Sequence, residues 1–257
     1  MSKYRLKLDH VVVVVPSLKV AIEQYRSLGF TLSLGGDNGP THNALIAFQD
    51  GSYIELISVR SRLLRVIFKV FYQTKLITLF KPFTSHLRFR FMCWIGGPDG
   101  IRDWCIKQIR LEPLANALNS KKVSMSRIEK FTRSKPNLEI AEWLLVAPKD
   151  RLLPFFIEDI SHIDVRIPSG NSARHSNGCK GISSLLLDQR RYSSIQGQLA
   201  ILSQQGAVAY DDSDHIEIKF VSKQAGQIFL ELVGIGNTKV VLTMPSQETP
   251  RLLISPQ

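Results

Sequence analysis

The stretch from Leu8 to Val59 constrains the fold most, because it has the sequence pattern of one complete βαβββ unit. It opens with an apolar run, Leu8–Val15, whose β-branched composition favours a buried strand. An amphipathic segment follows to about Leu28, and Ser17 is suited to cap its first turn as a helix. Three strand-like segments complete the unit, at residues 29–34, 42–48 and 52–59, with a Gln49-Asp50-Gly51 hairpin signal between the last two.

His10 lies within the first of these apolar strands and Glu55 within the last. A histidine inside a strand is most often a hydrogen-bonded core residue, and a lone glutamate usually lies at the surface. Glu55, however, shares one face of its strand with Tyr53 and Ile57, which argues for enclosure. Because a buried carboxylate needs a cation or a hydrogen-bond partner, His10 and Glu55 become the first candidates for a functional site.

The same order of segments returns further along the chain. A second unit is predicted to begin with a strand at Leu87–Ile95, to continue with a helix from Ile101 to about Leu118, and to end with a strand that contains Glu158. The whole chain then divides into a first βαβββ unit (1–60), a basic apolar connector (61–85), a second unit (86–161), a linker (162–180), a third, weaker βαβββ-like unit (181–236) and a C-terminal tail (237–257).

The composition is ordinary for a globular protein, with 44% hydrophobic and 21% charged residues. No apolar run is long enough to span a bilayer, and the first ten residues lack the apolar stretch of a signal peptide. The three cysteines are widely spaced and form no CxxC pair, which argues against a disulfide framework and a zinc finger. These features predict a cytoplasmic protein.

A basic segment follows the first unit. No acidic residue lies between Glu55 and Asp99, and the bases alternate with apolar residues. Three interpretations stay open: a connecting helix packed on the sheet, a lid over a ligand pocket, or weak contact of residues 60–90 with an anionic membrane. Nucleic acid is not an expected partner, because no binding motif accompanies the charge. The eight bases are Arg60, Arg62, Arg65, Lys69, Lys75, Lys81, Arg88 and Arg90.

Paired βαβββ units with these residues resemble the vicinal oxygen chelate superfamily, and within it the glyoxalase-like domain proteins. The resemblance implies an α+β fold in which repeated βαβββ units form curved mixed sheets around a cavity. In that fold the first and last strands of a unit are neighbours, so His10 and Glu55 would both project into the cavity. The segments that carry the resemblance are Leu8–Val12, Gly39–Leu45, Asp50–Leu56, Pro154–Glu158 and His175–Ile182.

The resemblance also implies a divalent metal ion, held by a histidine or similar ligand from each first strand and a glutamate from each last strand. His10, Glu55 and Glu158 match this pattern, and Glu55 or Glu158 would serve as the catalytic base. The predicted first strand of the second unit departs from it, with Met92 at the position that corresponds to His10. If Arg90 or Arg88 entered the cavity instead, it would pair with a glutamate and replace the metal by an ion pair. The residues expected to bind substrate are His42, Asn43, Arg90 and Trp94.

Two functions are consistent with these residues. The first is a metal-dependent lyase, isomerase or dioxygenase that acts on a small substrate with two adjacent oxygens. The alternative is a non-catalytic protein of the same fold, which binds a small molecule without a functional metal site. No serine-hydrolase, phosphate-loop or zinc-protease motif is present. The substrate and the oligomeric state are not indicated by the sequence.

Overall fold

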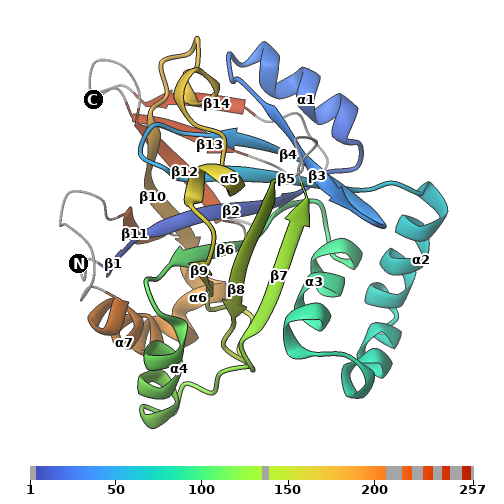
Figure 1. Cartoon of the computed structure of the whole chain (residues 1–257), viewed down its shortest axis with the longest axis vertical. Helices are drawn as coiled ribbons and strands as arrows, with labels where there is room; N and C mark the ends of the chain where they lie inside the picture. Colours follow the sequence, from blue (N-terminus) through green and yellow to red (C-terminus); the bar gives the residue numbers. More distant parts are fainter. Residues whose placement is uncertain are drawn as a thin grey trace.

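The computed structural model describes residues 4–134, 139–206, 216–221, 228–233, 239–243 and 251–255. Its strands form one sheet of eight strands and one of six, with helices packed around them (Figure 1). None of the helices within these ranges is long and apolar enough to cross a membrane.

The first βαβββ unit has the predicted order of elements, but its second strand, expected at residues 29–34, lies at Ser33–Asn38. The hydroxyl of Ser17 accepts a hydrogen bond from the amide of Val20 and so caps the helix. Gly51, at a φ of +81°, supplies the left-handed conformation of the predicted hairpin turn. The elements are β2 (Leu8–Val14), α1 (Leu18–Ser27), β3 (Ser33–Asn38), β4 (Thr41–Ala47) and β5 (Tyr53–Val59).

The second unit begins later than predicted. The strand expected at Leu87–Ile95 is wrong, because these residues lie in a helix, α3 (His86–Gly96). Apolar runs of this length fit both structures, and Leu87, Arg90 and Trp94 are buried at helical spacing. The segment after Ile101, expected to be helical, starts as a strand instead. The unit consists of β6 (Gly100–Lys107), α4 (Leu111–Ser120), β7 (Glu129–Ser134), β8 (Ile140–Val146) and β9 (Phe155–Asp159).

The two units join into one curled mixed sheet with the strand order β3-β4-β5-β2-β6-β9-β8-β7. In each unit the first and last strands pair in parallel, and the two first strands, β2 and β6, meet in antiparallel pairing. One face of the sheet belongs to the main hydrophobic core, together with residues of α1 and α4. The other face is the hollow of a half-barrel. The α+β fold of repeated βαβββ units around a cavity is thus confirmed.

The six-stranded sheet contains the segment that was predicted as a third unit. Its first strand, β10, pairs in parallel with β11. It pairs antiparallel with β12, the last strand of the predicted third unit, whereas in the other two units the first and last strands are parallel. Two strands also lie within the predicted tail, and the strand predicted at Ala207–Tyr210 lies outside the described residues. The sheet contains β1 (Tyr4–Leu6), β11 (Ile216–Val221), β10 (Gly181–Asp188), β12 (Ile228–Val233), β13 (Lys239–Thr243) and β14 (Arg251–Ser255), with α6 (Gln189–Tyr192), η3 (Ser193–Ile195) and α7 (Gln196–Gly206) after β10.

The segments between units are helical. The predicted connector forms α2 (Arg62–Gln73) and η1 (Leu76–Phe83), and the predicted linker forms α5 (Ile163–Arg166) and η2 (Gly170–Ala173). Helix α3 covers part of the hollow of the half-barrel, where Leu87 and Trp94 join a core cluster with Leu145 and Phe155. Helix α2 lies outside α3, at the edge of the molecule (Figure 1).

Candidate functional site

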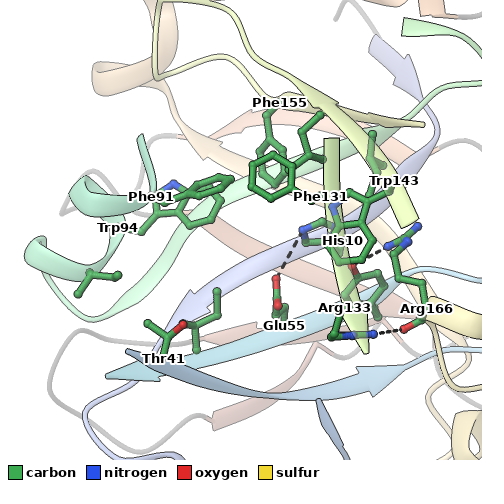
Figure 2. Close-up of a pocket in the computed structure, with 15 residues that line it drawn as sticks. His10, Thr41, Glu55, Phe91, Trp94, Phe131, Arg133, Trp143, Phe155 and Arg166 are labelled. Carbon is green, nitrogen blue, oxygen red and sulfur yellow. Dashed lines mark hydrogen bonds and ion pairs between the residues drawn. The ribbon is translucent and has the colours of Figure 1, made fainter. Parts of the chain in front are cut away.

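A pocket of about 320 Å³ lies in the hollow of the half-barrel, between the eight-stranded sheet and α3. Aromatic side chains from both βαβββ units and from α3 form its walls, and His10 and Glu55 project into it from β2 and β5 (Figure 2). The aromatic residues are Tyr53, Phe91, Trp94, Phe131, Trp143 and Phe155. The strands of the first unit therefore bring together the two residues that the sequence singled out.

His10 is held on the pocket face by a β-bulge. The β2–β6 register shifts between Leu8 and His10. As a result Leu8 and Val11, which are three residues apart and would lie on opposite faces of a regular strand, both pack in the main hydrophobic core behind the sheet. The imidazole Nδ1 lies 2.6 Å from an oxygen of the Asp9 carboxylate. The ring stacks on that of Tyr53, with the centroids 4.6 Å apart. His10 and Asp9 are both buried.

Arg166 neutralises this buried carboxylate. Its guanidinium donates two hydrogen bonds to Asp9, of 2.9 and 2.7 Å, two to Asp159, and one to the hydroxyl of Tyr53. Burial alone would raise the pKa of Asp9, but Arg166 and His10 outweigh it and hold that pKa below its usual range. Asp9 is therefore ionised and can only accept, so Nδ1 of His10 carries the proton and Nε2 is turned to the pocket.

Glu55 is oriented by its neighbour on β4. The side-chain amide of Asn43 donates a 2.6 Å hydrogen bond to Oε1 of Glu55, and the other oxygen, Oε2, lies 3.7 Å from Nε2 of His10. The Glu55 side chain is 18% exposed and so remains open to a ligand. Two groups able to give or accept a proton thus face each other at one end of an aromatic pocket.

The second unit carries different residues at the equivalent positions. His10 lies eight residues before the first residue of α1, and Asp103 lies eight residues before the first residue of α4. The strand pairing agrees, since His10 lies opposite Cys105 and Val12 lies opposite Asp103 in a nearly symmetric register. Glu55 pairs with Val12 and Phe155 pairs with Cys105, so Phe155 is the counterpart of Glu55.

The carboxylate of Asp103 accepts hydrogen bonds from two side chains of α3. Arg90 donates to both of its oxygens, at 2.6 and 2.7 Å, and the indole of Trp94 donates a third bond of 2.7 Å. Arg90 is only 1% exposed, and it also donates to the backbone carbonyl of Leu153. Arg90 thus pairs with an acidic residue of the second unit, but that residue is Asp103 rather than a glutamate, and Arg90 does not line the pocket.

Glu158 and His42 lie away from the pocket. Glu158 follows Phe155 and Ile157, which line the pocket, and its side chain is on the opposite face, where it accepts a 2.7 Å bond from the amide of Leu111 at the start of α4. His42 lies between Thr41 and Asn43 on β4, so its side chain is on the face of the sheet opposite to theirs. Of the predicted substrate-binding residues, Trp94 lines the pocket, Asn43 reaches it through Glu55, and Arg90 is bound to Asp103.

The residues present do not fit the divalent-metal site that the resemblance implies. His10 and Glu55 supply two ligands, but Asp103 is paired with Arg90, Phe155 has no ligand atom, and Glu158 is on the other face. Catalytic zinc sites usually keep three protein ligands.

Asp9, His10 and Cys105 form a second possible ligand cluster, with ligand atoms within 4.8 Å of one another. Both oxygens of Asp9, however, already accept bonds from the Arg166 cation. Burial also holds the pKa of the Cys105 thiol well above its usual value.

Sequence reasoning missed four residues that shape the site: Asp9, Asp103, Asp159 and Arg166. A signal existed for Asp103, because the spacing from His10 to its helix repeats in the second unit once β6 is recognised. Asp9 and Asp159 each stand next to a candidate residue. Nothing local in the sequence indicates Arg166, which comes from α5, 157 residues from Asp9 in the chain.

Comparison with known proteins supports this fold. A family model described as a glyoxalase-like domain matches residues 8–202. The solved structure of a hypothetical protein from Staphylococcus aureus is similar over 91% of this chain and 94% of that one, with a TM-score of 0.61 and 15% sequence identity. Methylmalonyl-CoA epimerase from Mycobacterium tuberculosis covers 62% of this chain and 90% of its own, with a TM-score of 0.35 and 16% identity. No curated protein matches the chain in sequence.

At 15% identity the structural likeness shows the fold alone, whereas the family model extends from β2, through both βαβββ units, to α7. This match includes His10, Glu55 and the segment that supplies Arg166. The chain belongs to the glyoxalase-like domain family.

Proposed function

We propose that this protein binds a small, largely apolar molecule in the aromatic pocket, with a polar group of that molecule placed against His10 and Glu55. The observation that carries the proposal is the pocket itself. Its volume of about 320 Å³ and its aromatic walls are typical of small-molecule sites, which surround a few oriented polar groups with apolar surface.

The polar groups of the pocket indicate which features the molecule should have. Glu55 offers a carboxylate oxygen to a hydroxyl or N–H donor. Arg133 also lines the pocket, and its buried Nε has no hydrogen-bond partner among the described residues, although its Nη2 donates to the carbonyl of Arg166 (Figure 2). An acceptor on the ligand, such as a carbonyl or a carboxylate, would satisfy this nitrogen.

Calorimetric titration with naphthol, a hydroxyl donor, and naphthoate, a carboxylate acceptor, tests the proposal. Both probes should bind, and the variant Thr41→Trp, which places an indole at the pocket lining, should weaken binding at least about tenfold by filling the space. Thr132→Trp, on β7 outside the pocket, is the matched control and should bind as the wild type does. The proposal fails if neither probe binds and native mass spectrometry finds no copurified small molecule.

A second candidate function is an enzyme of the isomerase or lyase type that moves a proton on the bound molecule. It is favoured by the Asp9 carboxylate, which fixes the proton of His10 on Nδ1 and leaves Nε2 facing Glu55 across 3.7 Å. Small ketones incubated in heavy water with the protein should then exchange their α-protons, as read by NMR. The Glu55→Gln variant keeps the side-chain shape and should abolish this exchange. Equal exchange with and without protein would exclude this candidate.

The metal-dependent lyase, isomerase or dioxygenase suggested by the resemblance competes with both proposals. It would need ligands beyond His10 and Glu55, and the nearby carboxylates of Asp103 and Asp9 are already paired with arginines. Elemental analysis of protein purified without chelator separates the alternatives. A near-stoichiometric divalent ion that is lost in His10→Ala would restore the metal-dependent enzyme, and we expect no such ion.

We also propose a cytoplasmic location for this protein. Support comes from the three cysteines, Cys93, Cys105 and Cys179, which are free and buried as in a reducing compartment. Fractionation of cells that express the full chain would test this proposal.

A further inference from the structure

Helices α2 and η1 expose an unusual amount of apolar surface. Of the fourteen large hydrophobic side chains that are exposed in the described part of the chain, eight lie between Leu63 and Phe83. We call their exposed side chains the α2–η1 surface. Single exposed apolar residues are common, but a local concentration of them marks an interaction site. The most exposed are Leu63, Val66, Val70, Leu76, Leu79 and Phe83, and Phe83 is 87% exposed.

Helix α2 is apolar on two sides, and only one of them is covered. Phe68 and Tyr72 meet α3, where a Cβ added to Gly96 would lie 2.7 Å from the carbonyl of Phe68, so the two helices pack closely. Phe71 stacks on Phe80 of η1, with the centroids 5.9 Å apart. The exposed Leu63, Val66, Ile67 and Val70 recur at helical spacing on the other side, and no residue of α2 is fully buried. One side of α2 therefore packs on α3 and η1, and its other apolar side is exposed.

The charge of this surface is positive. No acidic residue lies between Glu55 and Asp99, and the carboxylate of Asp99 is bound by Arg65 and Lys69. Three further cations, Arg62, Lys75 and Lys81, are exposed and form no ion pair with any described acidic residue. Exposed apolar side chains thus stand beside cations that lack acidic partners.

We propose that the α2–η1 surface docks onto an anionic lipid surface. Apolar side chains beside Lys and Arg are the combination that holds a helix in the interface of a bilayer, where the side chains enter the acyl boundary and the cations meet anionic headgroups. A second copy of the chain is a poorer occupant. A symmetric contact would place the same cations against each other, with no free acid in the segment to pair with them.

This docking would bring the pocket close to the lipid without depending on its proposed function. Helix α3 lies between the two regions, since its Phe91 and Trp94 line the pocket while its Phe89 and Cys93 pack in the cluster of Ile77 of η1. Lipid binding therefore tests the surface, and the naphthol and naphthoate titrations test the pocket.

Cosedimentation of the full-length protein with vesicles tests the proposal. Vesicles of phosphatidylcholine mixed with phosphatidylglycerol should bind the protein, and vesicles of phosphatidylcholine alone should bind it at least about tenfold more weakly. Binding to the anionic vesicles should also fall as salt is raised, because exposed charges are screened.

Paired variants of exposed residues locate the contact. Leu79→Ser with Phe83→Ser removes two apolar contacts, and its matched control is Leu34→Ser with Ile140→Ser, two side chains that are 77% and 55% exposed elsewhere. Lys75→Glu with Lys81→Glu reverses two cations, and Lys121→Glu, at the exposed end of α4, is its control. Each test variant should lose about tenfold or more in vesicle binding, and each control should bind as the wild type does.

Three results would overturn the proposal. One is no binding to anionic vesicles. Another is equal loss of binding in the test variants and their controls. The third is a wild-type dimer in sedimentation equilibrium that becomes monomeric in Leu79→Ser with Phe83→Ser and binds no vesicle, because that would assign the surface to a second copy of the chain.

Discussion

The two βαβββ units share one backbone arrangement but present different chemistry to the pocket. In the first unit His10 and Glu55 face the hollow, and each is held by one neighbouring side chain, Asp9 or Asn43. In the second unit the equivalent positions are Asp103 and Phe155. Asp103 is bound by Arg90 and Trp94 of α3, and Phe155 forms part of the pocket wall.

This difference shows how one half of a duplicated site is turned into structure. Asp103 is a charged residue at the position equivalent to His10, but the helix inserted between the units supplies the cation that neutralises it. A buried ion pair gains little over an apolar core, yet the loss of one partner is costly because the other charge is left buried. The second unit therefore supports the pocket, while the first unit supplies the groups available to a ligand.

The largest expected effect concerns Arg90. Arg90→Ala should lower the free energy of unfolding by about 3–5 kcal/mol, because Asp103 would be left as a buried charge without its partner. Urea denaturation measures this change. Arg88→Ala is the control on the same helix, since Arg88 is exposed and lies 3.8 Å from Glu129, and it should cost about 1 kcal/mol or less. Equal costs for the two variants would show that the buried pair does not support the second unit.

A substitution at Phe155 should give the second unit a carboxylate at the position equivalent to Glu55 of the first unit. Phe155→Glu adds a carboxylate near His10, whose ring centroid lies 5.4 Å from that of Phe155, and so supplies the missing third ligand. Cobalt ion at a hundredfold excess over its dissociation constant should then raise the free energy of unfolding by about 2.7 kcal/mol. Ile157→Glu, also at the pocket, is the control and should gain less. If cobalt affects both variants and the wild type equally, ligand number does not distinguish the units.

The Asp9–Arg166 pair should make the first unit sensitive to acid. The pKa of Asp9 is lowered in the folded protein, so the pair contributes its full stability above the ordinary aspartate pKa of about 3.9 and loses it as the pH falls further. Asp9→Asn should cost about 2 kcal/mol at neutral pH, and this cost should shrink below pH of about 4. Urea midpoints of both proteins across this range provide the measurement. A difference independent of pH would contradict the assignment.

The smallest expected effects are on ligand affinity, and they distinguish Asn43 from its neighbour His42 on β4. Asn43→Ala removes the amide that orients Glu55 and should weaken naphthol binding about fivefold, the value of one hydrogen bond. His42→Ala changes the opposite face of the strand and should leave the affinity within about twofold. Calorimetric titration measures both. A larger effect of His42→Ala would return it to the site as a substrate-binding residue.

Much of the first unit could be predicted from local sequence. The β-branched run, the cap at Ser17 and the hairpin turn at Gly51 each act over a few residues, and the structure contains all three. The second unit was harder, because the apolar run at Leu87–Ile95 fits a strand and a helix equally well. Only its packing against Leu145 and Phe155 selects the helix. Misplacing that strand also misplaced the counterpart of His10, at Met92 instead of Asp103.

The sequence by itself determined the βαβββ pattern of the first unit, the positions of His10 and Glu55 within apolar strands and the positive charge of the segment after that unit. These follow from periodicity, turn chemistry and composition, which act along the chain. Only the tertiary structure decided that His10 and Glu55 meet, that Glu158 faces the other way and that Arg166 neutralises Asp9. Those relations depend on strand register and on contacts between residues far apart in the chain, where a shift of one residue reverses the face of a side chain.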